Sequence, residues 1–258
     1  MTSDLVEMRD ISKTFGAVTA LNHVSLSVPH GSVIGLVGDN AAGKSTLMKI
    51  LAGAILPDDG QILIDGQPAS YREPTGARAA GIEMIYQDFA LVPDLTVAQN
   101  IFLGREILRH WPAGVRTLDR AAMNERSREL FADLGLLVPS VTLPVQALSG
   151  GQQQAVAIAR ATGFDANLVI MDEPTANLGA PAIKKVRETI KRLKASGVAV
   201  IIISHRLEDI FAIGDVIAVM KQGRLVAERA VGDTDNAEVV EMIVTGRDPR
   251  AVQTAADA

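Results

Sequence analysis

The sequence contains no cysteine, few aromatic residues and no excess of basic charge. Without cysteine, the chain can form no disulfide, thiolate zinc site, iron–sulfur cluster or cysteine nucleophile. Aromatic residues make up 3%, which is too few for the base-stacking platforms of proteins that bind single-stranded nucleic acid. Lys and Arg number 25 against 30 Asp and Glu, and the net charge of −5 argues against a surface built to hold phosphate backbones. We therefore expect no nucleic-acid partner.

Long hydrophobic runs are also missing. The longest strongly apolar run, residues 198–203, is far shorter than the roughly 18 residues that a membrane-spanning helix needs. The first seven residues include Asp4 and Glu7 and lack the basic-then-apolar pattern of a secretory signal. If the protein works at a membrane, we expect a partner to hold it there.

Short apolar runs alternate with helical patterns over much of the chain, and this alternation predicts an α/β fold. Three continuous apolar runs are typical of strands that are buried on both faces, namely residues 33–37, 168–171 and 198–203. Apolar residues recur at helical spacing between them, in 44–51 and in 183–193. Together they predict a mainly parallel sheet covered by helices on both sides. Near the end, Gln222-Gly223 separates two further short strands and predicts a hairpin.

The middle of the chain, residues 88–161, has a different pattern, because helical spacing dominates and strands fade. Asp119 is a predicted cap for a helix with Met123, Leu130 and Leu134 on its buried side, and Gly135 is the predicted stop. We interpret this segment as a helical insertion. Its basic residues are interpreted as an ordinary solvated face; they include Arg105, Arg109 and Arg116.

A phosphate-binding loop follows the first buried run. The stretch Gly38-Asp39-Asn40-Ala41-Ala42-Gly43-Lys44-Ser45 fits the pattern G-x-x-x-x-G-K-[ST] between a predicted strand and a predicted helix. Glycines let the backbone wrap closely round phosphate oxygens, and the N–H groups and the helix start attract an anion. Lys44 is predicted to reach the β- and γ-phosphates, Ser45 to bind Mg²⁺ and Thr46 to reach the α-phosphate. The alternative is a chance glycine turn.

Two acids end the second apolar run. Phosphoryl transfer from a nucleotide needs a carboxylate near the metal and a group that positions the attacking water. Asp172 stands at the predicted strand tip, where we expect it to hold Mg²⁺ through water. Glu173 follows and is predicted to polarise the attacking water as a general base. The plainer reading is a strand end with two solvated acids.

The stretch Leu-Ser-Gly-Gly-Gln at 148–152 completes a resemblance to ATP-binding cassette (ABC) proteins. It lies between the phosphate loop and the acid pair, in that family's order, and the resemblance covers about residues 3–247. The resemblance implies a P-loop NTPase (RecA-like) core, an N-terminal antiparallel β subdomain and a helical subdomain inserted at about 88–161. Residues 248–258 are expected to form a flexible tail.

The resemblance also implies roles for single residues. Phe15 resembles the aromatic residue that stacks on adenine, and its plainer reading is an ordinary core Phe. Gln87 resembles the glutamine that contacts Mg²⁺ and the water and senses the membrane partner. His205, at the end of a buried run, resembles the histidine that contacts the γ-phosphate. Structural roles are the alternatives for both.

In the family, two cassettes pair head to tail around ATP. The resemblance implies that Ser149, Gly150, Gly151 and Gln152 of one chain bind the ATP held by Lys44 of a second. It implies a homodimer or a second cassette protein, integral membrane permease subunits and an extracytoplasmic binding protein. The expected location is the cytoplasmic face of the cell (inner) membrane, reached through the permease subunits.

Two positions depart from the family pattern. Position 41 is Ala where the family mostly has Gly, and a positive φ there would cost about 1 kcal/mol. Residues 176–179 read Ala-Asn-Leu-Gly, so Gly179 stands where the family usually has an Asp that meets the opposite phosphate loop. This second change puts the coupling between the two ATP sites in question, but not ATP binding.

Further stretches resemble the bacterial monosaccharide importers of the ribose, xylose and fructose type. These stretches are residues 87–106 and 244–247. Many members of that group fuse two cassettes, so this chain resembles the single-cassette branch. The expected function is ATP hydrolysis that powers sugar import. The alternatives are an ABC ATPase for an amino acid, peptide or lipid, a non-transport ABC ATPase, or a binding protein with an inactive phosphate loop.

Overall fold

A six-stranded sheet forms the centre of the molecule. The computed structural model describes residues 4–176 and 178–251. The strands run in the order β12-β11-β3-β10-β9-β6, and every neighbouring pair is parallel except β11 and β12. Their bounds are β3 (Val33–Gly38), β6 (Ile82–Ile85), β9 (Leu168–Asp172), β10 (Ala199–Ile203), β11 (Val216–Lys221) and β12 (Arg224–Ala230). The predicted mainly parallel sheet and the terminal hairpin are confirmed.

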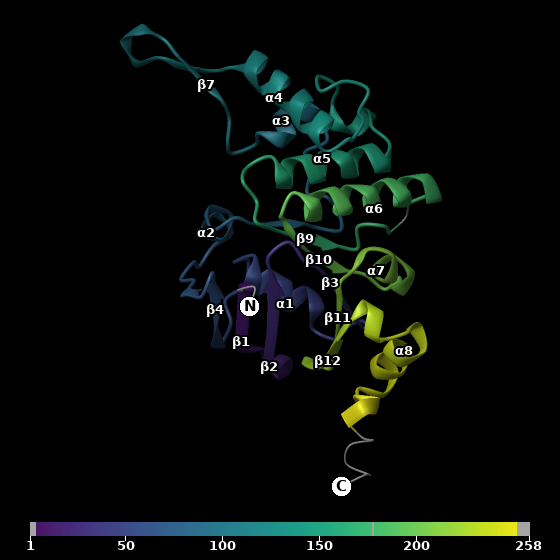
Figure 1. Cartoon of the computed structure of the whole chain (residues 1–258). Helices are drawn as coiled ribbons and strands as arrows, with labels where there is room; N and C mark the ends of the chain where they lie inside the picture. Colours follow the sequence, from purple (N-terminus) through teal and green to yellow (C-terminus); the bar gives the residue numbers. More distant parts are fainter. Residues whose placement is uncertain (1–3, 177, 252–258) are drawn as a thin grey trace.

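The two faces of this sheet belong to two hydrophobic cores. Along β3, Val33 and Val37 join one core, while Ile34 and Leu36 join the other. This alternation explains why the run is apolar throughout, since each successive side chain enters an opposite core. Helices cover both faces (Figure 1); their bounds are α1 (Lys44–Leu51), α5 (Gly150–Thr162), α6 (Ala180–Ala195), α7 (Leu207–Ile213) and α8 (Asn236–Thr245).

A second sheet, antiparallel throughout, covers the α1 side. Its order is β2-β1-β4-β5, with bounds β1 (Asp4–Phe15), β2 (Val18–Pro29), β4 (Asp59–Ile64) and β5 (Gln67–Pro68). Leu5, Met8 and Leu26 are buried in the same core as Leu47 of α1. The expected N-terminal antiparallel sheet is therefore present. Helix α2 (Pro74–Ala79) leads from it to β6.

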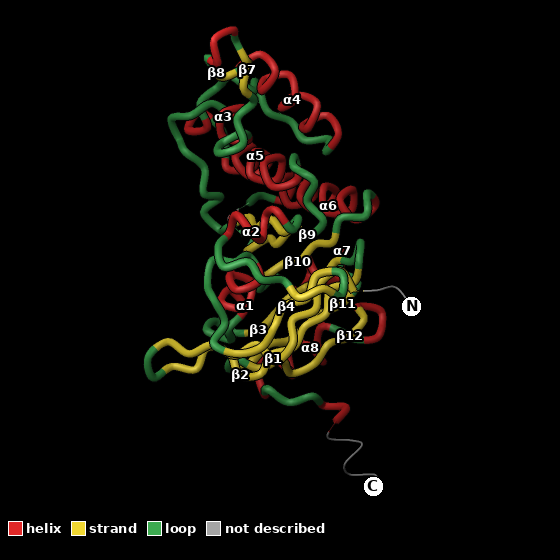
Figure 2. Tube along the Cα trace, turned by 90° about the vertical axis from the view of Figure 1, so that its left-hand side faces the viewer, coloured by secondary structure: helices red, strands yellow, loops and turns green. Residues whose placement is uncertain are grey.

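The helical middle section stands at one end of the molecule (Figures 1 and 2). It contains α3 (Val97–Ile101) and α4 (Arg120–Asp133), which pack beside α5. The Asp119 side chain accepts a hydrogen bond from the Ala122 N–H at 3.0 Å, so the predicted cap is confirmed. Met123 and Leu130 are buried as predicted, and Leu134 is half-buried just past the helix end.

Two expectations for this section are wrong. The section was expected to be helical with few strands, but β7 (Leu108–His110) and β8 (Arg116–Leu118) form a separate two-stranded sheet in it. Arg105 is not simply solvated, because it pairs with the buried Glu83 and its guanidinium lies 4.5 Å from the Phe164 ring centre. A nearby carboxylate and an aromatic face outweigh hydration at this position.

The last described residues follow α8 at the C-terminal end of the chain. The predicted tail, 248–258, lies outside the described residues from 252 onward. Asp248 accepts a hydrogen bond at 2.5 Å from Arg229 of β12. No helix among the described residues is both long and apolar enough to cross a membrane.

Candidate functional site

A cavity of about 230 Å³ lies where the strands β3, β9 and β10 end. It is lined by residues 40–46, Gln87, Asp172, Glu173 and Ile203. Because these strands are parallel, their carboxyl ends meet at one edge of the sheet, which is where ligands bind in open α/β folds. The fold thus brings three separate predicted segments together: the phosphate loop, Gln87 and the acid pair.

The backbone of the phosphate loop requires two of its glycines. Gly38 has φ +148°, and a Cβ there would collide with the Met220 carbonyl oxygen. Gly43 has φ +98°, directly precedes α1, and a Cβ there would lie 2.6 Å from the Ala20 carbonyl oxygen. Ala41 adopts φ +65°, so the conformational cost considered above applies, at about 1 kcal/mol. The loop holds this shape with Ala in place of the family's usual Gly.

Lys44 is fixed over the loop that precedes it. Its Nζ donates hydrogen bonds to the carbonyl oxygens of Gly38 at 2.7 Å and Asp39 at 2.8 Å. Burial lowers the pKa of the Lys44 ammonium, while the charges of Glu173 and Asp172 act against that shift. The ammonium and the N-terminal end of α1 therefore present positive potential to the same cavity.

Asp172 lines the same cavity as this positive end. It is the last residue of β9. Burial raises the pKa of its carboxyl group, and the charge of Glu173 adds to that rise; Lys49, Lys44 and the Ser45 hydroxyl oppose it. A cation bound here would favour the ionised carboxylate, so the environment of Asp172 suits a metal ligand.

Glu173 occupies a strained backbone position. Its φ is +52°, a left-handed conformation that is costly for a residue other than Gly. The Glu173 N–H donates to the Ile203 carbonyl oxygen at 2.9 Å, which ties it to the end of β10. The side chain is 17% exposed, so the carboxylate is neither solvated nor closed off from the cavity.

His205 reaches the same carboxylate from the next strand end. Its Nδ1 lies 2.8 Å from Oε2 of Glu173, but the two atoms are not aligned for a hydrogen bond, and this buried oxygen has no hydrogen-bond partner. The His205 side chain is 68% exposed. The fold thus brings Glu173 and His205, two residues predicted separately from the sequence, into contact. Oε2 of Glu173 accepts no hydrogen bond among the described residues.

Phe15 lies outside this cavity. It is the last residue of β1 and is 48% exposed, so the reading of an ordinary core residue is wrong. Lys13 Nζ lies 5.5 Å from the Phe15 ring centre. An exposed ring of this kind is accessible to a planar ligand.

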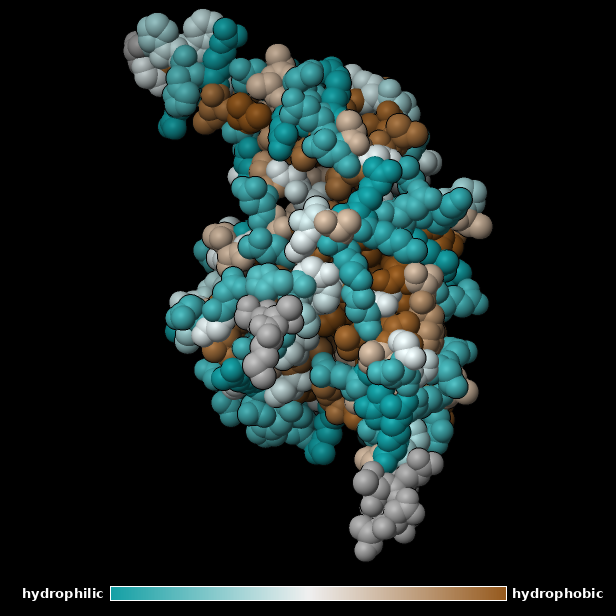
Figure 3. Space-filling view, in the orientation of Figure 1, coloured by the Kyte–Doolittle hydropathy of each residue, from teal (hydrophilic) through white to brown (hydrophobic). Residues whose placement is uncertain are grey.

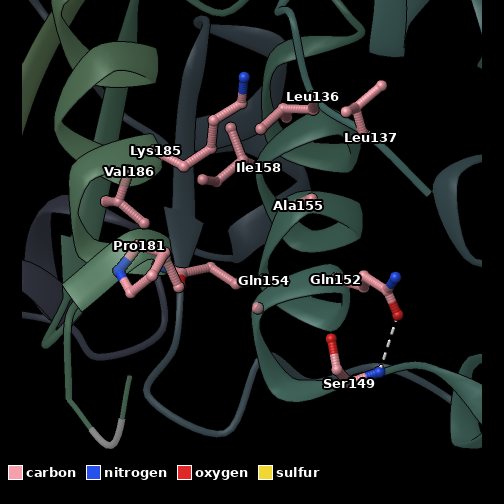
Figure 4. Close-up of a pocket in the computed structure, with 12 residues that line it drawn as sticks. Leu136, Leu137, Ser149, Gln152, Gln154, Ala155, Ile158, Pro181, Lys185 and Val186 are labelled. Atoms are coloured by element: carbon pink, nitrogen blue, oxygen red, sulfur yellow. Dashed lines mark hydrogen bonds between the residues drawn. The ribbon is translucent and has the colours of Figure 1, made fainter. Parts of the chain in front are cut away.

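The Leu-Ser-Gly-Gly-Gln segment is also placed away from the phosphate loop. Ser149 caps α5, whose first residues are Gly150 and Gly151, and Gln152 Oε1 accepts from the Ser149 N–H at 2.9 Å. The segment borders a different cavity of about 350 Å³ between α5 and α6 (Figure 4). Among the residues that the structure describes, the phosphate loop lines one cavity and this segment borders another. Gly179 caps the start of α6, and Asn177 lies outside the described residues.

Arg160 is a site-related residue that the sequence analysis missed. From α5 its guanidinium donates to the carbonyl oxygens of Phe89 and Ala90, both at 2.8 Å. Phe89 and Ala90 have φ of +60° and +46°, so Arg160 stabilises a strained turn just after Gln87. A lone charged residue in the apolar stretch 155–161 was the available signal.

Replacing Arg160 tests this connection. If the chain hydrolyses ATP as the resemblance implies, Arg160→Ala should lower kcat about tenfold, because Gln87 loses its fixed position while the phosphate loop is untouched. KM for ATP should change little, and Arg160→Lys should recover part of the loss because it keeps a donor. Steady-state phosphate release measures both constants. An Arg160→Ala protein with unchanged kcat would show that this turn does not position Gln87.

A second missed cluster lies behind the acid pair. Asp209 of α7 is 1% exposed and accepts hydrogen bonds from the Thr175 hydroxyl and from Arg187 of α6. Thr175 stands two residues after Glu173, so this ion pair anchors the segment that leaves the site. Thr175, α6 and α7 are separated in the sequence, so no local sequence pattern predicts this cluster.

Removing Asp209 should destabilise the fold. Asp209→Ala leaves Arg187 without its buried partner, and we expect the free energy of unfolding to fall by about 3 kcal/mol. The neighbouring Glu208→Ala is the control, since Glu208 is 84% exposed and contacts Arg206 only at 3.8 Å. Urea unfolding of both variants measures the difference. Equal midpoints for the two would contradict the anchoring role.

Comparison with known proteins extends the geometric picture. The family model described as "ABC transporter" matches residues 21–176. The chain is 42% identical over 243 residues to the xylose/arabinose import ATP-binding protein XylG of Sulfolobus acidocaldarius, covering 94% of this chain and 95% of that one. It is 45% identical over 240 residues to the ribose import ATP-binding protein RbsA 1 of Rubrobacter xylanophilus, covering 93% of this chain but 47% of that one. The chain thus spans about half of the latter relative.

Solved structures agree with these sequence matches. The ADP conformation of MJ1267, an ATP-binding cassette of an ABC transporter, superposes with a TM-score of 0.79 at 26% identity and covers 99% of both chains. The expected P-loop fold with a mostly parallel sheet, an antiparallel N-terminal sheet and surrounding helices is confirmed. So is the resemblance that was drawn from the Leu-Ser-Gly-Gly-Gln segment.

Proposed function

This chain belongs to the ABC transporter family as an ATP-binding ATPase subunit, and on that premise we propose that it hydrolyses MgATP to power the import of a monosaccharide. The observation that carries the proposal is the cavity in which Lys44 of the phosphate loop meets Asp172 and Glu173 from the end of β9. Converging basic and acidic groups at a helix start suit a bound triphosphate and its hydrolysis.

The oxygen donors at the cavity fit Mg²⁺. Ser45, Gln87 and Asp172 supply a hydroxyl, an amide and a carboxylate. Among the described residues no three His, Asp or Glu side chains form a cluster, which suits an ion that takes its remaining ligands from phosphate and water. When bound, Mg²⁺ would neutralise charge on the phosphates. Lys44 would hold the β- and γ-phosphates, and Phe15 would stack on the adenine.

Glu173 is proposed as the general base. Glu173 lines the cavity beside Gln87 and Asp172, where its carboxylate would accept the proton of an attacking water, and His205 lies against its buried Oε2. His205, at 2.8 Å from that oxygen, would orient the carboxylate and reach the γ-phosphate. Gln87 would position the water from the opposite wall. The strained backbone at Glu173 supports this assignment, because strain of this kind concentrates at active sites.

Two cassettes are proposed to enclose the nucleotide. The separation of the Ser149–Gln152 segment from the phosphate loop within one chain supports a site completed by a second cassette. Ser149 and Gly151 of the second chain would then bind the γ-phosphate, with Gly150 and Gln152 beside them. The partners proposed with this dimer are integral membrane permease subunits and an extracytoplasmic sugar-binding protein. The dimer would lie at the cytoplasmic face of the membrane, held by the permease.

The substrate class rests on the relatives. Two proteins named for xylose/arabinose and ribose import are more than 40% identical to this chain over most of its length. Cassettes do not contact the transported molecule, so the identity of the sugar has to be determined by measuring uptake. An amino acid, peptide or lipid transporter remains the competing proposal.

Uptake in cells that lack this chain tests the substrate. We expect uptake of labelled xylose, arabinose or ribose to fall and to return with the wild-type chain but not with Glu173→Gln. A matched assay with labelled amino acids should be unchanged. If cells that lack this chain take up every tested sugar normally while the purified chain still hydrolyses ATP, the proposal of sugar import is wrong. The ATPase activity would then stand.

A further inference from the structure

The hairpin of residues 108–118, here called the arm, forms a sheet of its own, separate from the two larger sheets that the structure describes. Strands β7 and β8 pair with each other and with no other strand of the described residues. Residues 108–112 and 114–118 are all exposed, and the arm projects from the helical end of the molecule (Figure 1). A lone two-stranded hairpin is marginally stable in water, so its sequence is informative about what covers it.

The arm carries large apolar side chains that are exposed to solvent. Leu108, Trp111, Val115 and Leu118 are 40%, 48%, 54% and 45% exposed. Leu108 and Leu118 face each other across the two strands. A group of exposed apolar side chains on a projecting element marks a site that contacts another molecule or a membrane. In Figure 3 the projection shows both hydrophobic and hydrophilic surface.

The same arm is basic in an acidic protein. Residues 108–118 contain Arg109, His110 and Arg116 and no acid, although the whole chain has a net charge of −5. Neither arginine makes an ion pair within residues 4–176 and 178–251. The Arg109 guanidinium lies 4.9 Å from the ring centre of Trp111, and the Trp111 indole N–H donates to the Thr117 hydroxyl at 2.9 Å. Unpaired cations beside exposed apolar groups complement an anionic, partly apolar surface.

We propose that the arm docks on the anionic lipid surface of the membrane. Alternation along the strands places Leu108, Leu118 and Arg116 on one face of the ribbon, and Arg109, Trp111 and Val115 on the other. Basic and apolar side chains thus lie on both faces, which suits an anionic headgroup layer that surrounds the ribbon. Trp and Arg are the side chains that combine an apolar body with a polar end at such an interface. This contact is separate from ATP hydrolysis and from the sugar, so its failure would leave the proposed function standing.

Intrinsic fluorescence tests the proposal directly, because Trp111 is the only tryptophan in the sequence. Vesicles of phosphatidylglycerol should shift the emission of the full chain to shorter wavelength, and phosphatidylcholine vesicles should not. High salt should reverse the shift. Arg109→Gln with Arg116→Gln should weaken partitioning about 30-fold, since each basic residue near an anionic surface contributes about fivefold.

A matched pair of substitutions controls for net charge. Arg126→Gln with Arg128→Gln removes the same charge from α4, where both side chains are about half exposed, and should change partitioning by less than about twofold. Trp111→Ser should also partition more weakly, and its co-sedimentation with the vesicles gives a readout without the fluorophore. Circular dichroism checks the fold of each variant. Equal partitioning of the two double variants, or a shift seen only in neutral vesicles that contain permease subunits, would overturn the lipid assignment. The latter outcome would make the arm a permease contact.

Discussion

Glu173→Gln is expected to lower the rate of ATP hydrolysis about 1,000-fold while ATP still binds. The amide keeps the size of the side chain but cannot accept the proton of the attacking water. Lys44, Ser45 and the backbone of residues 40–46 remain in place, so the grip on the phosphates should persist. Phosphate release under saturating ATP measures the rate, and equilibrium binding of a fluorescent ATP analogue measures the affinity.

Glu188→Gln provides the control for Glu173→Gln. Glu188 is an exposed glutamate on α6 and lines none of the phosphate cavity. Its replacement should leave both rate and affinity unchanged. If Glu173→Gln hydrolyses ATP as fast as the control, Glu173 is not the general base, and the proton must leave through another group.

Lys44→Ala is expected to weaken ATP binding about 100-fold. The substitution removes the ammonium that lies against the Gly38 and Asp39 carbonyl oxygens and faces the cavity. Without it, Asp172 and Glu173 leave the cavity with an unbalanced negative charge that repels a triphosphate. Titration calorimetry with ATP and Mg²⁺ measures the effect.

The matched control for Lys44→Ala is Lys184→Ala, an exposed lysine on α6. It removes the same charge at a distance from the cavity and should leave the affinity within about twofold. Loss of affinity of similar size in both variants would mean that net charge, and not the contact made by Lys44, governs binding.

Contiguous patterns predicted most of the fold. The helix predicted at 44–51 coincides with α1, and the predicted strand tip at Asp172 is the end of β9. Both could be predicted because a buried parallel strand and an amphipathic helix each impose a strong local pattern of apolar residues. The arm was missed for the opposite reason, since strands of three residues such as β7 are too short to show any period.

The candidate site divides in the same way. Residues 38–46 and the pair Asp172 and Glu173 could be predicted because each lies within one short stretch. Arg160 and Asp209 could not, because their partners are 70 and 34 positions away in the sequence and meet them only in the folded chain. The cost at Ala41 was foreseen, but its φ of +65° needed the structure.

In the proposed dimer, ATP is enclosed between the phosphate loop of one chain and the Ser149–Gln152 segment of another. The chain has no native cysteine, so two introduced cysteines report on this arrangement alone. Asn40 is exposed in the loop, and a side chain at Gly150 would meet no atom of the same chain within 4 Å, so neither change creates a clash within one chain.

The decisive measurement is oxidative cross-linking of the Asn40→Cys, Gly150→Cys chain in the Glu173→Gln background, read on a non-reducing gel. We expect a two-chain product that forms with MgATP and does not form when nucleotide is omitted. Absence of that product, or a cross-link that stays within one chain, would contradict it.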